Sequence, residues 1–158
     1  MNLEAITLTR ADLTDPVSRA LIADLNAELS ALYDEPGANH FHLDPTEVAE
    51  GCGVFLVMRL GGVPVGCGAL RLLAPDLAEL KRMFVAPAAR GKGLGHRLVS
   101  ALEIEARTLG VRRLVLETGI RQTAALALYA AAGFQPIPLY GEYCLSPDTS
   151  RCLGKDLT

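Results

Sequence analysis

The chain has 158 residues and half of them are apolar, which is enough to form a buried core and too apolar for a disordered chain. No apolar run approaches the roughly 20 residues of a membrane span, and the first residues lack the charged-then-apolar pattern of a signal peptide. The net charge of −3 argues against a nucleic-acid-binding protein. We therefore expect a single cytoplasmic domain over residues 1–158.

The first fifty residues predict one strand and two helices. Residues 5–10 have a strand pattern, and Asp15 and Pro16 are typical of a helix N-cap and a first helical position. A second helix is expected to begin at Asp44, where Glu47 has the position of a capping-box partner. In the first helix an apolar residue at every fourth position marks one face, at Val17, Leu21, Leu25 and Leu29.

The middle of the chain predicts a hairpin, a third strand and a long helix. Residues 54–60 and 63–72 are apolar runs joined by two glycines, which is a strong hairpin signal. Residues 77–85 have a strand pattern, and residues 94–109 a helical one that ends at Gly110. The buried stripe of this helix is expected at Leu94, Leu98, Leu102 and Leu109.

The last third predicts a strand at residues 113–117 and a helix at residues 124–132 closed by Gly133. Strand-like segments follow at residues 140–145 and 152–156. We find no repeat, low-complexity tract or domain linker. The alternation of strands and helices indicates one α/β domain with a mixed sheet.

Positive charge is concentrated in one segment of this acidic chain. Residues 81–113 hold eight Lys or Arg and two Glu, a net charge of +6, whereas the remainder carries a net charge of −9. This distribution indicates a local anion site. The four cysteines show no short paired spacing and are expected to be reduced thiols: Cys52, Cys67, Cys144 and Cys152.

A glycine-rich loop, Arg90-Gly-Lys-Gly-Leu-Gly95, comes directly before the helix predicted at residues 94–109. A nucleotide-binding P-loop needs Ser or Thr after its Lys, where this chain has Gly93. The dinucleotide fingerprint needs a glycine where this chain has His96. What remains is Arg-x-x-Gly-x-Gly at a helix N-terminus, where bare backbone N–H groups and the helix dipole favour an anion.

With its surroundings, this loop strongly resembles the central motif of the GNAT superfamily of N-acetyltransferases. The resemblance begins in Leu77-Ala-Glu-Leu-Lys-Arg-Met-Phe-Val85 and continues through Arg90-x-x-Gly93-x-Gly95. Leu116-Glu-Thr-Gly119 and Ala125-x-x-Leu-Tyr129-x-x-x-Gly-Phe134 are similar to the superfamily's next motif. The resemblance covers residues 77–134 and implies a GNAT-type acyltransferase fold. This fold has a central mixed, mostly antiparallel sheet of about six or seven strands flanked by about four helices.

The resemblance implies acetyl-CoA as co-substrate and no metal. The pyrophosphate would lie on the main-chain amides of residues 90–96. The pantetheine arm would pair with the main chain of residues 83–85, where the family's strand bulges and separates from the next one. The implied cofactor-binding residues are Met83, Phe84, Val85, Arg90, Gly91, Lys92, Gly93, Leu94, Gly95 and His96.

The implied reaction is direct transfer of the acetyl group to a primary amine of a small molecule or peptide. An alkyl amine with a pKa of about 10.4 is neutral in only about one molecule in 2,500 at pH 7, so a general base is useful. Glu79 has the position at which histone-modifying relatives place a glutamate base; Glu117 or a water chain are the alternatives. Tyr129 corresponds to the superfamily's tyrosine that protonates the leaving thiolate.

Other interpretations remain open. A catalytically silent acyl-CoA-binding regulatory domain would have the same motifs, and a phosphate-loop nucleotide enzyme is a more distant alternative. His40 and His42 with Cys52 lack a second paired motif, which argues against zinc. We expect an amine acceptor, neither nucleic acid nor membrane as partner, and a monomer or homodimer. Candidates for lining a pocket for a cationic amine are Asp34, Glu35, Glu142 and Asp148.

Overall fold

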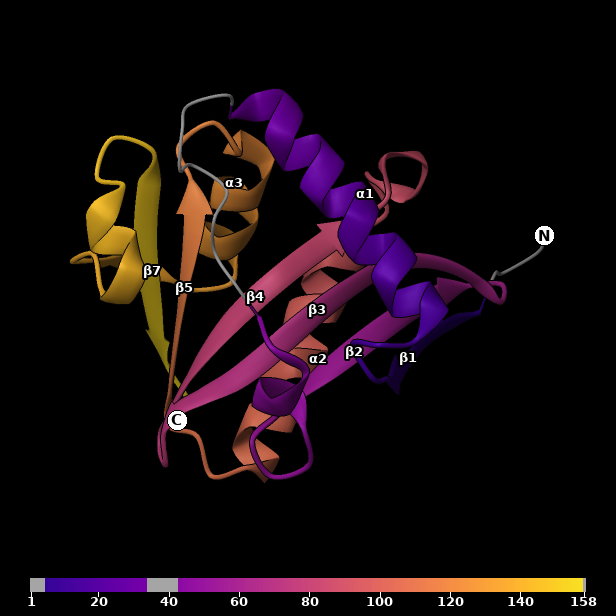
Figure 1. Cartoon of the computed structure of the whole chain (residues 1–158), viewed down its shortest axis with the longest axis horizontal. Coiled ribbons are helices and arrows are strands. Elements are labelled where there is room, and N and C mark those ends of the chain that lie inside the picture. The colour runs from indigo at the N-terminus through magenta and orange to yellow at the C-terminus, as the bar shows by residue number, and fades with distance from the viewer. Residues whose placement is uncertain (1–4, 34–42, 158) are drawn as a thin grey trace.

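The computed structural model describes residues 5–33 and 43–157, which form a seven-stranded mixed sheet with helices on both faces (Figure 1). Only β4 and β5 pair in parallel within this sheet, as expected for a mostly antiparallel one. The sheet order is β1-β2-β3-β4-β5-β7-β6. The strands are β1 (Ile6–Arg10), β2 (Gly53–Leu60), β3 (Val63–Ala74), β4 (Leu77–Val85), β5 (Arg113–Gly119), β6 (Gln135–Ile137) and β7 (Ser150–Asp156).

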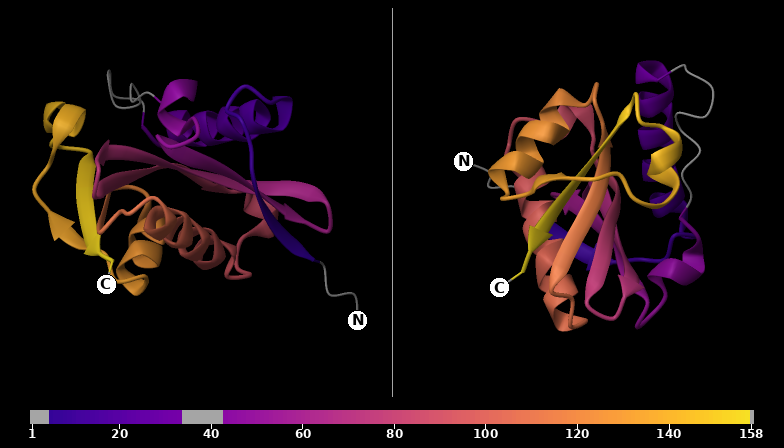
Figure 2. Two further views of the ribbon diagram at one scale, coloured as in Figure 1. Left: turned by 90° about the horizontal axis from the view of Figure 1, so that it is seen from below. Right: turned by 90° about the vertical axis from the view of Figure 1, so that its left-hand side faces the viewer.

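Three α-helices of the described residues cover the sheet. Figure 2 shows α1 (Pro16–Leu32) on one face and α2 (Leu94–Thr108) with α3 (Thr123–Ala131) on the other. The described helices include none that is both long and apolar enough to cross a membrane. Short 3-10 turns complete the helical structure at η1 (Pro45–Val48), η2 (Pro87–Ala89) and η3 (Gly141–Leu145).

The second predicted helix is only the turn η1. The expected capping box does form between Asp44 and Glu47, and the Asp44 backbone N–H donates to Glu47 at 2.9 Å. The chain nevertheless turns to extended backbone at Ala49, and η1 has no buried residue. Without an apolar face to bury, the capping signal alone does not propagate a helix.

The sheet separates two apolar cores. Beneath α2 and α3 lies the larger one, in which Leu98 and Leu102 of the predicted stripe are buried. Leu109, the last predicted stripe residue, is the C-cap of α2 and is only partly buried. Beneath α1 lies the smaller core, where Leu21 and Leu25 pack in one cluster with β2 and β3. The predicted apolar faces therefore fix the position of both helices.

The C-terminal segment differs from the prediction at two places. Residues 140–145, expected to be strand-like, form η3, which brings Tyr143 into a buried position. Backbone bonds from Tyr143 to Tyr140 and from Ser146 to Tyr143 close this turn. The sequence analysis also missed β6, a three-residue strand that contains Pro136 and pairs with β7. Neither its length nor its proline is typical of a strand.

The central strands separate halfway along their length. β4 and β5 pair only from residues 77–80 to residues 113–116, after which β4 stays with β3 and β5 with β7. A bulge follows in β4, because three steps from Lys81 to Phe84 match two steps on β3. Arg82 in this bulge has a φ of 56°, a positive value rare outside glycine. The bulge implied by the resemblance is therefore present, and the gap between the strands opens beside it.

Candidate active site

A groove of about 860 Å³ runs from the end of β4 along the starts of α2 and α3 to the inner side of α1. It contains nine of the ten residues predicted to bind a cofactor. Lys92, the tenth, is exposed and does not line the groove. The nine are Met83, Phe84, Val85, Arg90, Gly91, Gly93, Leu94, Gly95 and His96.

The loop before α2 exposes backbone donors to this groove. Gly91 and Gly93 have φ values of 81° and 74°, a conformation that favours glycine, and Gly93 is the N-cap of α2. The Arg90 amide donates to the Pro87 carbonyl at 3.3 Å. Within the described chain, the N–H groups of residues 91–96 donate to no backbone carbonyl, as expected at a helix start. These N–H groups are the donors that the sequence analysis expects to bind an anion.

Gly95 has a different structural role from Gly91 and Gly93. A Cβ placed there would come within 3.0 Å of Leu128 Cδ2 in α3. A Cβ on Gly93, in contrast, would meet nothing within 4 Å. Gly95 therefore allows α3 to pack closely against α2, while Gly93 serves the loop's backbone conformation.

The Arg90 side chain connects the loop to α1. Its Nη2 lies 2.5 Å from Glu28 Oε2, and its Nε donates to the Val85 carbonyl at 2.9 Å. Arg90 and Glu28 both line the groove. This ion pair thus holds one wall of the groove against another.

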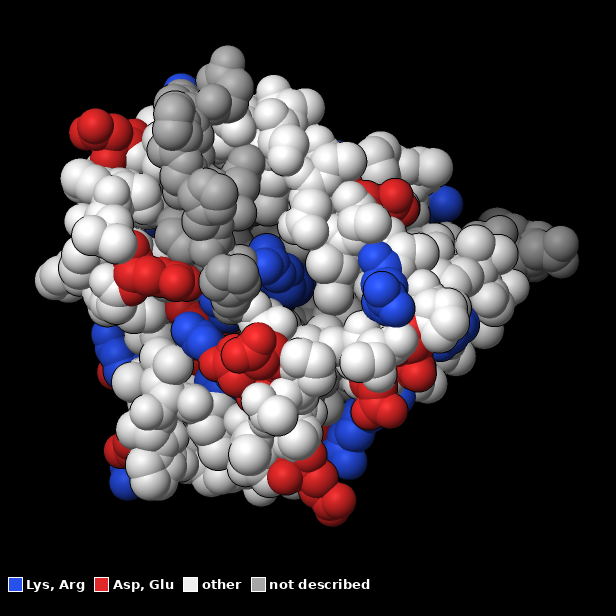
Figure 3. Space-filling view, viewed as in Figure 1, with Lys and Arg blue, Asp and Glu red and all other residues white. Residues whose placement is uncertain are grey.

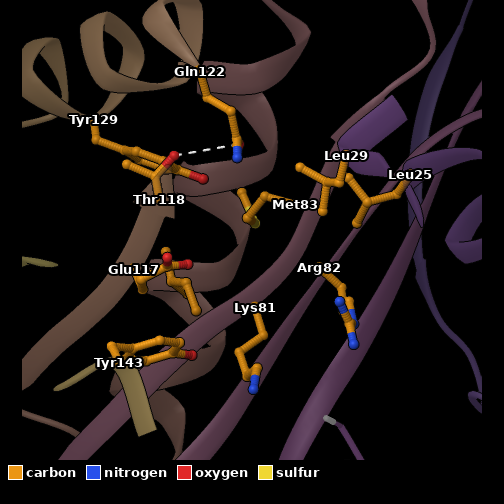
Figure 4. Close-up of a pocket in the computed structure, with 11 residues that line it drawn as sticks. Leu25, Leu29, Lys81, Arg82, Met83, Glu117, Thr118, Gln122, Tyr129 and Tyr143 are labelled. Carbon is orange, nitrogen blue, oxygen red and sulfur yellow. Dashed lines mark hydrogen bonds between the residues drawn. The ribbon is translucent and has the colours of Figure 1, made fainter. Parts of the chain in front are cut away.

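A smaller cavity of about 80 Å³ adjoins the groove (Figure 4). The two spaces share four lining residues, so their walls meet: Leu25, Met83, Gln122 and Tyr129. The small cavity is otherwise lined from the separated strands, α1 and η3, by Leu29, Leu80, Lys81, Arg82, Glu117, Thr118 and Tyr143. A reactant in the groove and one in the cavity would therefore meet beside Tyr129.

Tyr129 is buried at this junction. Its ring packs edge-on against Phe134, with ring centroids 5.7 Å apart. Burial raises the pKa of the Tyr129 hydroxyl, and the charge of Glu117 raises it further. The hydroxyl therefore keeps its proton at neutral pH and can act as a proton donor.

Glu117 lines the small cavity from the end of β5, where the gap between the strands opens. The Ser150 hydroxyl donates to Glu117 Oε2 at 2.6 Å. Burial raises the pKa of the Glu117 carboxyl, and the nearby carboxylates of Glu79 and Glu142 act in the same direction. A carboxylate with a raised pKa is a stronger base than an ordinary glutamate, and one that faces a cavity can accept a proton from a reactant there.

Glu79 lies outside both cavities, in the paired part of β4. Its side chain is 0 % exposed. Arg71 Nε donates to Glu79 Oε1 at 2.7 Å, and the Tyr140 hydroxyl donates to Oε2 at 2.5 Å. Arg71 is also bonded to Glu47. The structure thus surrounds Glu79 with donors of its own chain, one of which is the cation Arg71.

The residues of the small cavity that the sequence analysis gave no individual role include Lys81, Arg82 and Tyr143. Lys81 and Arg82 counted only toward the charge of the basic segment, and Tyr143 lay in a segment read as strand. For Lys81 and Arg82, only their position directly after Glu79 and Leu80 in the motif could have indicated a role. No sequence pattern indicated that η3 would bring Tyr143 to β4.

Several other predicted groups lie elsewhere. Glu142 sits 3.6 Å from Lys81, and Asp148 is exposed; neither lines the groove or the small cavity. Asp34, Glu35, His40 and His42 lie outside the described residues. Among the residues described, no three His, Cys, Asp or Glu side chains gather as a metal site. The four cysteines are unpaired, and burial raises the pKa of the Cys67 thiol to about 12.

Comparisons with known proteins agree with the motifs. The profile of the Acetyltransferase (GNAT) family matches residues 19–134. An IAA acetyltransferase of Azospirillum brasilense is 38% identical over 143 residues, which are 90% of this chain and 92% of the relative. The crystal structure of a candidate acyl-CoA N-acyltransferase of Klebsiella pneumoniae superposes with a TM-score of 0.81 at 36% identity, covering 97% of this chain and 98% of that one. A GNAT family acetyltransferase of Elizabethkingia anophelis, solved with acetyl-CoA bound, has the same fold at 20% identity and a TM-score of 0.70, covering 96% of this chain and 98% of that one.

Proposed function

The chain belongs to the GNAT family of acetyltransferases, and we propose that it moves the acetyl group of acetyl-CoA directly to a primary amine. One observation carries this proposal: a groove with a glycine-rich helix start at one end meets a small cavity with polar side chains at Tyr129. The groove would hold the acetyl donor, and the small cavity would hold the acceptor. No covalent enzyme intermediate is needed, because the two reactants meet at the shared wall.

In this proposal the donor's pyrophosphate binds the N–H groups of residues 91–96. These donors need no particular side chain at position 92, which agrees with the exposure of Lys92. The pantetheine arm follows residues 83–85, on the edge of β4 that no longer pairs with β5. Acetyl-CoA bound to the Elizabethkingia protein supports this arrangement at the level of the shared fold.

Glu117 is the proposed base. It faces the small cavity, where the acceptor amine would lie, whereas Glu79 is enclosed by Arg71 and Tyr140. Removing a proton from an amine at pH 7 costs about 4.6 kcal/mol for a pKa of about 10.4. A carboxylate beside the ammonium group, acting directly or through water, offsets part of this cost.

Tyr129 is the proposed acid. The amine nitrogen forms a bond to the thioester carbonyl carbon, the carbon–sulfur bond breaks, and the sulfur takes the Tyr129 proton. The ammonium nitrogen loses two protons overall. One proton replaces that of Tyr129, and the other leaves to solvent by way of Glu117. The protonated hydroxyl that burial maintains is the form this step requires.

A panel of primary amines incubated with acetyl-CoA tests the proposal by following free thiol. IAA is tested beside the amines because the Azospirillum relative is named for it. We expect thiol release that depends on the acceptor and an acetylated amine identified by mass. If acetyl-CoA raises the melting temperature but no acceptor releases thiol, the silent acyl-CoA-binding domain is the better description.

A further inference from the structure

We propose that the acceptor carries a carboxylate as well as an amine, and that Lys81 and Arg82 bind this carboxylate in the small cavity. The inference names a substrate class for the proposed function, a short amino acid, and so rests on that function. It replaces the expectation of a pocket for a purely cationic amine.

The bulge in β4 is what places two cations together. Consecutive residues of a regular strand point to opposite faces of the sheet. Here the extra residue between Lys81 and Phe84 breaks this alternation, and both Lys81 and Arg82 line the same cavity. Figure 4 shows the two side chains extending from β4 in the same direction. The left-handed backbone at Arg82 is therefore linked to a specific arrangement of charge.

The surroundings of these cations favour an additional anion. Lys81 is buried, and its pKa is lowered first by burial and then by the charges of Arg71 and Arg82. Two carboxylates raise the Lys81 pKa instead: Glu142, whose Oε1 lies 3.6 Å from Lys81 Nζ, and Glu79. Glu79 is also bonded to Arg71 and Tyr140. Burial likewise lowers the pKa of Arg82. A bound carboxylate would stabilise the charged form of both cations.

The positions of the other polar groups orient the acceptor. Glu117 and Tyr129 come from β5 and α3, across the gap from Lys81 and Arg82 on β4 (Figure 4). An amine beside Glu117 and a carboxylate beside β4 place the two groups at opposite sides of one small space of about 80 Å³. Figure 3, which has the view of Figure 1, shows Lys and Arg atoms in a hollow near the centre of the molecule. The arrangement favours an amine and a carboxylate separated by a short link.

A binding experiment tests the inference without requiring turnover. The twenty common amino acids and their carboxamides are titrated into the protein saturated with coenzyme A. We expect at least one acid to bind about 100-fold more tightly than its own amide. Arg82→Gln should remove most of this preference and leave the affinity for its amide unchanged. Arg82→Lys, the matched control, should retain the preference within about tenfold, because it keeps the charge.

Both variants keep a residue other than glycine at the left-handed position, so the substitution adds no new backbone strain. An unchanged melting shift with coenzyme A shows that each variant still folds. The inference is overturned if no amino acid binds in preference to its amide, or if Arg82→Gln weakens acid and amide equally. Preferential binding without thiol release would contradict the proposed catalysis and support the carboxylate site. Equal thiol release with the amino acids and with their carboxamides would contradict the inference but not the proposed function.

Discussion

The Tyr140 hydroxyl donates a hydrogen bond of 2.5 Å to Glu79, and this contact holds the Glu79 carboxylate in place. η3 brings Tyr140 and Tyr143 to β4. Burial raises the pKa of each tyrosine, and the charge of Glu79 and hydrogen bonding to its carboxylate raise it further. Arg71 completes the group and connects it to Glu47 in η1. Glu79 therefore joins the C-terminal segment to the central strands.

Glu79→Gln should destabilise the fold more than it impairs the chemistry. The change removes a buried charge from Arg71 and weakens the bond from Tyr140, which we expect to cost about 2–3 kcal/mol. That corresponds to a fall of roughly 4–12 °C in melting temperature. Thermal unfolding and steady-state kinetics of one preparation measure both effects. A stable variant with a large loss of kcat/KM, recovering at high pH, would return the base role to Glu79.

Glu117→Gln should change the pH dependence of the reaction. Below the amine pKa, kcat/KM falls tenfold per pH unit, and below the pKa of Glu117 it should fall a hundredfold per unit. Because burial raises the Glu117 pKa, the steeper limb should begin above the range of an ordinary glutamate. The variant should keep the single slope throughout and be roughly 10²-fold slower at neutral pH. The same steep limb in wild type and variant would exclude Glu117 as the base.

The same variant should gain stability at neutral pH. A carboxyl whose folded pKa is raised stabilises the fold below its unfolded pKa, and this contribution is lost as the pH rises through the folded pKa. Gln resembles the protonated form, so Glu117→Gln should unfold at higher urea than wild type at pH 7.5 and at similar urea at pH 4. Ser150 can still donate to the amide oxygen. A variant less stable than wild type at pH 7.5 would show that the charged carboxylate supports the fold.

The pyrophosphate site can be tested with a matched pair at Gly93. Asn and Asp both tolerate its left-handed backbone better than other side chains do, at a shared cost of about 1 kcal/mol. Only Asp adds a negative charge beside the proposed diphosphate. We expect Gly93→Asp to bind acetyl-CoA about 10–100-fold more weakly than Gly93→Asn, by calorimetry, with a smaller difference at high salt. Equal affinities would place the pyrophosphate elsewhere.

Local patterns predicted most of the fold. The hairpin at residues 53–74, the strand Leu77–Val85 and the helix that begins at Leu94 follow from apolar spacing and glycine positions. η3 and β6 could not be predicted in the same way. η3 brings Tyr143 into the interior, and β6 exists only because β7 offers it a partner. Such elements depend on tertiary contacts that no short window of sequence contains.

The backbone conformation of the loop before α2 was predictable, because the positive φ angles fall on glycines that the sequence shows directly. The carboxylate proposed as the base was harder to assign. Glu79 and Glu117 both stand in matching motif segments, and only the separation of β4 from β5 after residue 80 shows which one faces a cavity. The roles proposed for Lys81 and Arg82 depend on a bulge of one residue, which the spacing of apolar residues in the sequence does not reveal.

Acetyl transfer is proposed to occur beside the Tyr129 hydroxyl, and Tyr129→Phe tests this most directly. The phenylalanine ring can still pack against Phe134, so the walls of both cavities should remain. The measurement is kcat against the acetyl-CoA dissociation constant in one preparation. We predict that kcat falls roughly 10²-fold or more while the dissociation constant changes by less than about twofold, as expected for loss of a positioned proton donor. Full activity in the variant would contradict the proposed acid, and equal losses in binding and rate would make Tyr129 a wall of the donor site.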